Sequence, residues 1–233
     1  GQNVNAGTTS MSGVVRQSNA IKKSGYVGKI SVVGSHVQAL PKETLEKENS
    51  VDFVFLGEGV YSILEILKKK DLSKESLLEC KGIAFRDGDR VLFTESSKPV
   101  NGSDMDIDLP GYAWDLLPFR KKPFDLYRSP LWHANYIDED RSPYAAIQTS
   151  LGCQFKCSFC MINLINKDDS SEISLASNYN RMRHWSVDTV NNQFQKLVEM
   201  GVKTIRITDE MFFLNKKYYV PIIRNLVKLN KKD

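Results

Sequence analysis

The sequence runs Thr149-Ser-Leu-Gly-Cys153-Gln-Phe-Lys-Cys157-Ser-Phe-Cys160, which spaces three cysteines as C-x3-C-x2-C. Thiolates are the soft ligands that iron–sulfur clusters require, and one short loop can direct three of them at three irons. A four-iron cluster held in this way keeps one iron open, where a substrate can bind and be activated. The spacing therefore predicts an iron–sulfur site whose metal ligands are Cys153, Cys157 and Cys160.

Two simpler metal sites are alternatives for the same cysteines. A structural zinc site uses four ligands, commonly from two C-x2-C pairs, and this sequence has one such pair. Cys80, His133 or His184 could supply a fourth ligand to zinc, and Cys80 could complete an electron-transfer cluster, although none is near in sequence. Because Cys80 stands in an apolar stretch, we expect it to be a small buried hydrophobic residue.

A strand, a helix and a second strand are expected around the cysteine motif. The first strand covers 145–149, the helix begins after an N-cap at Ser186, and the second strand covers 203–208 and leads to Asp209-Glu210. Strands joined by a helical crossover are parallel, so their carboxyl ends meet at one rim of the sheet, where ligands bind. We therefore expect the start of the cysteine loop to lie beside Asp209 and Glu210.

The first 70 residues alternate strands and helices, which is typical of an α/β fold. Short apolar runs over 29–34 and 51–56 predict buried strands, and helices are expected over 13–24, 42–47 and 60–69. This alternation favours a parallel sheet.

The middle of the chain breaks the alternation. Two strand-like runs, 82–86 and 90–95, flank Asp87-Gly88-Asp89, which predicts a hairpin. Six of the eight prolines fall between Pro99 and Pro143, so this stretch reads as an irregular linker whose aromatic residues pack on a neighbouring element. The expected domains are residues 1–70, a linker over 71–141, and residues 142–233.

Composition narrows the class of protein. The 233 residues carry 32 basic and 28 acidic side chains, a net charge of +4, which is too small an excess to indicate nucleic acid as a partner. No apolar run is long enough to predict a membrane span. Because three of the four cysteines are clustered rather than spread as in a secreted disulfide scaffold, a reducing, cytoplasmic location is expected.

The cysteine motif resembles the C-x3-C-x-aromatic-C signature of the radical S-adenosylmethionine (SAM) enzymes, with Phe159 at the aromatic position. The resemblance implies that the three cysteines bind a [4Fe–4S] cluster, that SAM chelates the open iron, and that one electron cleaves SAM to methionine and a 5′-deoxyadenosyl radical. It also implies that Phe159 contacts the adenine and that Asp209 or, preferably, Glu210 contacts the SAM amino group. The alternative is that these acids cap the turn before Met211.

Other stretches resemble the cobalamin-associated branch of the superfamily. Three lie in the linker and after the cysteines: 114–118, 181–183 and 205–212. The N-terminal segment resembles that branch's cobalamin-binding, Rossmann-like domain through Thr8, Ser10, Gly34, Ser35 and the turn Gly57-Glu58-Gly59. The resemblance implies that these residues contact cobalamin.

The implied fold is a partial Rossmann-like cobalamin-binding domain followed by the first units of a radical SAM (βα)6 partial TIM barrel. The branch's D-x-H-x-x-G motif is absent, and only about two strand–helix units follow the linker. We therefore expect the chain to be the middle part of a larger enzyme.

The resemblance implies a cobalamin-dependent radical SAM enzyme, with C-methyl transfer as a candidate reaction. Its partners would be a small-molecule substrate and an external one-electron donor of the flavodoxin or ferredoxin type. A methylthiotransferase-like enzyme is an alternative, although its cysteine-rich N-terminal domain has no counterpart in this sequence. The second alternative is a non-catalytic iron–sulfur or zinc-binding module. The sequence assigns no catalytic residue.

Overall fold

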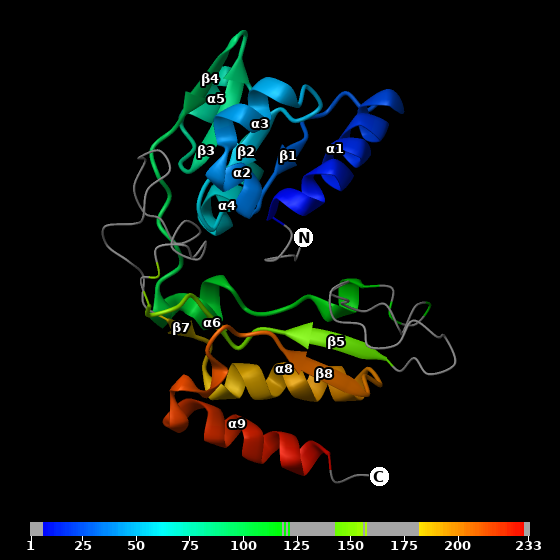
Figure 1. Ribbon diagram of the computed structural model, residues 1–233, viewed down its shortest axis with the longest axis vertical. Coiled ribbons are helices and arrows are strands. Elements are labelled where there is room, and N and C mark those ends of the chain that lie inside the picture. The colour runs from blue at the N-terminus through cyan, green and yellow to red at the C-terminus, as the bar shows by residue number, and fades with distance from the viewer. Residues whose placement is uncertain are drawn as a thin grey trace. The chain divides into compact units, whose positions relative to one another are not determined.

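The computed structural model describes residues 7–117, 119, 121, 143–155, 157 and 182–230. The chain divides into two compact units (Figure 1). Of the described residues, 7–100, 154, 155 and 157 belong to the first unit, and the described residues of 101–153 and 182–230 to the second. Each unit has a sheet and helices of its own, so the architecture is mixed α/β, as the sequence predicts. No helix among the described residues has the length and apolar character to cross a membrane.

The first unit is built on one four-stranded sheet in the order β1-β2-β3-β4. The strands are β1 (Ser31–Val32), β2 (Phe53–Phe55), β3 (Ile83–Asp87) and β4 (Arg90–Phe93). The pair β1–β2 is parallel, whereas β2–β3 and β3–β4 are antiparallel. The expected hairpin forms, but it also pairs with β2 through Val54 opposite Ala84, so the sheet is mixed and not parallel throughout.

Five helices cover this sheet on both faces. They are α1 (Gly7–Lys23), α2 (Ser35–Ala39), α3 (Pro41–Lys47), α4 (Val60–Lys68) and α5 (Lys74–Leu78). Side chains alternate along a strand, so Phe53 and Phe55 pack on one face with α4 and α5, while Val54 packs on the other with α1, α2 and α3. Cys80 lies in the first of these cores with 1% exposure, as expected, and burial raises the pKa of its thiol.

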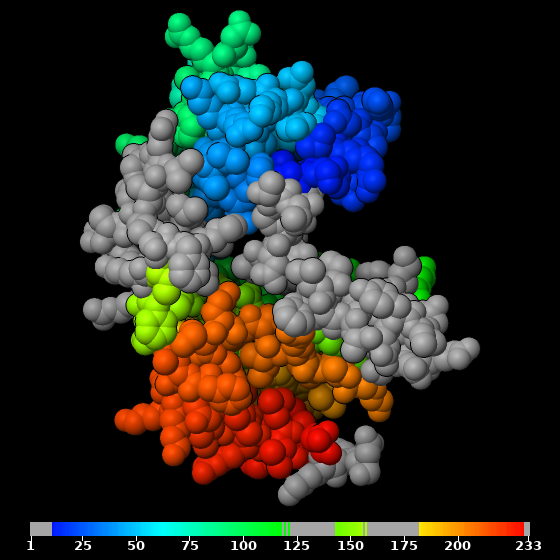
Figure 2. Space-filling view, in the orientation of Figure 1, coloured from blue at the N-terminus to red at the C-terminus, as the bar shows by residue number. Residues whose placement is uncertain are grey.

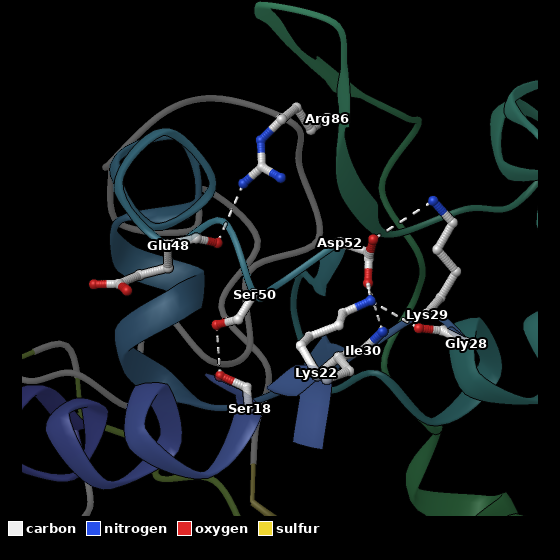
Figure 3. A network of polar contacts seen from close by, with 9 residues as sticks. All are labelled: Ser18, Lys22, Gly28, Lys29, Ile30, Glu48, Ser50, Asp52 and Arg86. Atoms are coloured by element: carbon white, nitrogen blue, oxygen red, sulfur yellow. Dashed lines mark hydrogen bonds and ion pairs between the residues drawn. The ribbon is translucent and has the colours of Figure 1, made fainter. Parts of the chain in front are cut away.

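A polar network ties α1 to the amino ends of β1 and β2 (Figure 3). Asp52 accepts hydrogen bonds from Ile30 N at 2.7 Å and from Lys22 Nζ at 3.0 Å, and Lys29 Nζ lies 3.5 Å away. Burial opposes ionisation of Asp52, but the Ile30 bond and the two lysine charges outweigh it and lower the pKa of the carboxyl group. The network therefore favours the ionised form of Asp52.

Gly82, the residue before the hairpin, is packed closely against its neighbours in the first unit. Gly82 has φ +71°, and a Cβ there would lie 2.5 Å from Ser62 Oγ and 2.6 Å from Ser97 Cβ. Both the positive φ and the lack of room for a Cβ therefore require glycine immediately before β3.

The second unit contains the strand–helix–strand arrangement that the sequence predicts. Strands β5 (Tyr144–Ile147) and β8 (Thr204–Ile207) are parallel, with Ala145 opposite Ile205. The crossover helix α8 (Val187–Glu199) begins at Ser186, whose hydroxyl accepts a hydrogen bond from Thr189 N at 3.1 Å. The other elements are η1 (Gly102–Asp104), α6 (Met105–Asp108), η2 (Trp114–Leu116), β6 (Ser150–Leu151), β7 (Arg183–His184), η6 (Phe212–Leu214) and α9 (Lys216–Leu229).

The described aromatic residues before β5, Tyr112, Trp114 and Phe119, pack into this unit, while the later aromatic residues of the expected linker lie outside the described residues. Trp114 is 2% exposed and shares a core with Ala145, Leu197 and Val202. Its indole Nε1 donates a hydrogen bond to Gln193 Oε1 at 2.8 Å, and the rings of Tyr112 and Trp114 stack at 4.6 Å. Part of the expected linker is thus integral to the second unit.

Candidate functional site

The carboxyl ends of β5 and β8 meet at one carboxylate. Asp209, two residues after β8, accepts a hydrogen bond from Thr149 N on Oδ1 at 2.6 Å. Its Oδ2 accepts from Thr149 Oγ1 and Ser150 Oγ, each at 2.6 Å. Thr149 and Ser150 are 0% and 2% exposed. The prediction that the start of the cysteine loop lies beside Asp209 is therefore confirmed.

A tyrosine from α9 reaches the same strand end. The Tyr218 hydroxyl donates to the Thr149 carbonyl oxygen at 2.6 Å, and the His184 ring meets the Tyr218 ring edge-on at 4.4 Å. Burial raises the pKa of the Tyr218 hydroxyl, so it stays protonated as the donor. Burial also lowers the pKa of His184, although the Asp209 charge opposes this shift. The region is thus a packed polar cluster beneath the loop.

The cysteine loop leaves this cluster after a short strand. β6 pairs antiparallel with β7, and Gly152, at φ +85°, turns the chain toward Cys153, which is half-buried, while Cys157 is exposed. Phe159 and Cys160 lie outside the described residues. Within the described part of the chain, no three His, Cys, Asp or Glu side chains are grouped to hold a metal, and the expected set needs Cys160.

The two acids after β8 differ in their surroundings. Both oxygens of Asp209 accept hydrogen bonds from the chain itself, whereas Glu210 is exposed. Desolvation by the surrounding protein raises the pKa of Glu210, and the Asp209 charge adds to this shift. Of the two residues, Glu210 is the more exposed, whereas the Asp209 carboxylate is engaged by Thr149 and Ser150. Phe213, an exposed aromatic residue in η6, follows Glu210 in the chain. The part of the second unit from α8 onward is orange to red in Figure 2.

A second candidate site lies at the carboxyl edge of the first unit's sheet. Because β1 and β2 are parallel, the turns that follow them share this edge, and a Cβ on Gly59 would lie 3.3 Å from Val33 Cγ2. Gly34 has φ +142°, and a Cβ built on it meets no atom within 4 Å. The Ser35 hydroxyl is buried and has no hydrogen-bond partner among the described residues.

The other residues that the resemblance assigns to cobalamin lie in the turn after β2 and in the first turn of α1. Gly57 and Gly59 both have positive φ, 68° and 79°. Between them, Glu58 Oε2 accepts a hydrogen bond from Val100 N at 2.8 Å and so ties down the end of the first unit. Thr8 and Ser10 lie in the first turn of α1, with side chains outside the described part.

Sequence reasoning missed Tyr218 and the pairing of β6 with β7. Tyr218 lies in a helix whose apolar spacing predicts only that one face is buried, and nothing local shows that its hydroxyl meets Thr149. The two-residue strands carry no periodic signal, because only a partner distant in sequence defines them.

Sequence comparison finds two relatives that are named as enzymes. No family model matches it. It is 29% identical over 190 residues to an uncharacterized methyltransferase of Pyrococcus horikoshii, covering 81% of this chain and 35% of that protein. It is 25% identical over 198 residues to the anaerobic magnesium-protoporphyrin IX monomethyl ester cyclase of Cereibacter sphaeroides, covering 83% and 27%. The chain thus spans about a third or less of these relatives.

Structural comparison finds chains with a similar fold. The fold resembles TsrM of Kitasatospora setae, a radical S-adenosylmethionine methyltransferase solved with tryptophan substrate and a SAM analogue, with a TM-score of 0.54 at 13% identity, over 94% of this chain and 36% of TsrM. TsrM with cobalamin and a [4Fe–4S] cluster bound gives 0.55 at 13% identity, over 94% and 37%. These comparisons confirm the resemblance to cobalamin-associated radical SAM enzymes predicted from the sequence.

Proposed function

We propose that this chain is part of a radical SAM enzyme in which Cys153, Cys157 and Cys160 hold a [4Fe–4S] cluster. The observation that carries the proposal is the C-x3-C-x2-C motif at the exit of β6, beside the acidic end of β8. Three thiolates suit the irons of such a cluster and leave one iron for SAM. When bound, the cluster supplies the electron that cleaves SAM to methionine and a 5′-deoxyadenosyl radical.

The chain's own groups would hold SAM at two points. Glu210 is the acid we assign to the SAM amino group, because it is exposed while Asp209 is engaged with Thr149 and Ser150. An ionised carboxylate is the natural partner of an ammonium group. We assign Phe159 to the adenine by resemblance alone.

We further propose that the carboxyl edge of the first unit holds cobalamin. The buried Ser35 hydroxyl, which meets no hydrogen-bond partner within the described part of the chain, and the open space beside Gly34 fit a ligand that passes close to the backbone and accepts a hydrogen bond. The turn of Gly57 and Gly59 shares this edge, while Thr8 and Ser10 are assigned by resemblance. We assign Glu58 to the support of this turn through Val100.

In this proposal the first unit is part of a Rossmann-like cobalamin-binding domain, and the second begins a (βα)6 barrel. The reaction is methyl transfer to a small molecule, as the names of the Pyrococcus relative and of TsrM suggest. The electron would come from a flavodoxin or ferredoxin in a reducing cytoplasm. The barrel strands that would complete the substrate pocket are expected in the longer protein.

The test is SAM cleavage by the longer protein that contains this chain. After anaerobic reconstitution with iron and sulfide and chemical reduction, we expect 5′-deoxyadenosine from the wild type and from Cys80→Ala, and none from Cys157→Ala. Cys80 is a matched control because it is buried in the first unit's core. A brown protein that leaves SAM intact would instead indicate an electron-transfer or structural cluster.

A further inference from the structure

We infer that Asp209 and Tyr218 are positioning residues that hold the chain at Thr149 and Ser150, the point from which the cysteine loop departs. This inference rests on the proposed function, because it concerns how the loop is prepared for its cluster. It gives Asp209 a role different from the SAM contact that the resemblance implies.

Asp209 holds the start of the cysteine loop with three hydrogen bonds. One carboxylate receives three hydrogen bonds of 2.6 Å from two consecutive residues, Thr149 and Ser150. Hydrogen bonds to an ionised acceptor are stronger than neutral ones, and burial strengthens them further. Removing this carboxylate would leave two buried hydroxyls and one backbone N–H without their hydrogen-bond acceptor.

Thr149 is held from both sides. Its N–H and hydroxyl point to Asp209, while its carbonyl oxygen accepts from Tyr218 Oη at 2.6 Å and from Trp185 N at 3.3 Å. The next residue, Ser150, pairs with His184 across β6 and β7. Every polar group of Thr149 is thus fixed by a residue far away in the sequence.

The path from Ser150 to the first thiol is short. Cys153 follows Ser150 by three residues, which span at most about 11 Å even when fully extended. Gly152 turns the chain on the way, with φ +85°. Because Ser150 is fixed, the positions open to Cys153 are limited. A site binds its metal most tightly when supporting contacts of this kind preorganise the ligands.

The test uses amide hydrogen exchange of the protein without cofactors, then anaerobic reconstitution. For Asp209→Asn we expect exchange at Thr149 and Ser150 to rise about tenfold or more, because bonds to a charged group are lost. We expect a severalfold loss of bound iron and a broadened electron paramagnetic resonance (EPR) signal from the reduced cluster. A loss of global stability alone would not broaden that signal.

Tyr218→Phe keeps the ring beside His184 and removes only the hydroxyl. It therefore tests the same contact in a variant that should fold even if Asp209→Asn does not. It should show the same changes to a smaller extent, with amide exchange at Thr149 and Ser150 rising about fivefold. Tyr219→Phe is the matched control, because Tyr219 lies on the same helix and its ring faces Phe212 and Phe213 at 6.1 and 5.3 Å. It should behave as the wild type.

The outcomes separate the inference from the proposed function. If Asp209→Asn binds iron as the wild type does but SAM no longer shifts the EPR signal, then Asp209 is a SAM ligand and the inference is wrong. Unchanged exchange at Thr149 in both variants would also overturn it. A wild type that takes up no cluster would overturn the proposed function itself, whatever the exchange rates.

Discussion

Replacement of Gln193 by leucine should destabilise the second unit measurably. Gln193 is 6% exposed and accepts the hydrogen bond of the Trp114 indole, which is 2% exposed, at 2.8 Å. Leucine has a similar size but offers no acceptor. A buried donor that loses its acceptor costs about 1–3 kcal/mol, so we expect about 2 kcal/mol, which for a unit of about 100 residues lowers the melting temperature by about 8–16 °C.

The assay is unfolding in urea followed by circular dichroism, with hydrogen exchange in α8 to assign the transition to the second unit. Gln195→Leu is the control, because Gln195 lies on the same helix but is exposed, and its amide donates a hydrogen bond to Glu199 Oε1 at 2.8 Å on the surface. It should change stability by less than about 0.5 kcal/mol.

A double-mutant cycle with Trp114→Phe isolates this hydrogen bond. Removing donor and acceptor together leaves no buried group unsatisfied, so the double variant should be more stable than the sum of the single losses by about 1–2 kcal/mol. A Gln193→Leu protein as stable as the wild type, or losses that simply add, would refute the reasoning.

Three further outcomes follow from the first unit. Gly82→Ala should cost about 2–4 kcal/mol in unfolding experiments, because it combines positive φ with steric overlap, whereas Gly88→Ala, with open space and φ +59°, should cost about 1 kcal/mol. Asp52→Asn should lower the melting temperature at pH 7; because the folded pKa of Asp52 is lowered, the wild type should lose this advantage as the pH falls below about 4. Iodoacetamide at pH 8, with labelling read by mass spectrometry, should modify the exposed Cys157 well before Cys80, whose thiol pKa is raised by burial.

Elements with a local signal could be predicted from the sequence. The helix after Ser186 has an N-cap and a regular apolar face, and the hairpin has Gly88 between two runs of strand-forming residues. The parallel arrangement of β5 and β8 followed from the helical crossover between them, and it correctly placed Asp209 beside Thr149.

Elements defined by distant partners could not be predicted. The five-residue helices α2 and α5 are too short for a periodic pattern to identify them. The pairing of the hairpin with β2 depends on the apolar face that Ala84 presents beside Val54, which no local rule reveals. The same applies to Tyr218, since a tyrosine on a helix gives no sign of which carbonyl it will meet.

The most direct test of the central claim is the metal content of the reconstituted protein. We expect about four iron and four sulfide per chain and a brown colour for the wild type, with an EPR signal that SAM shifts, and the same for Cys80→Ala. Cys157→Ala should lose the cluster. A colourless protein that holds stoichiometric zinc, or a cluster that survives Cys157→Ala unchanged, would contradict the account.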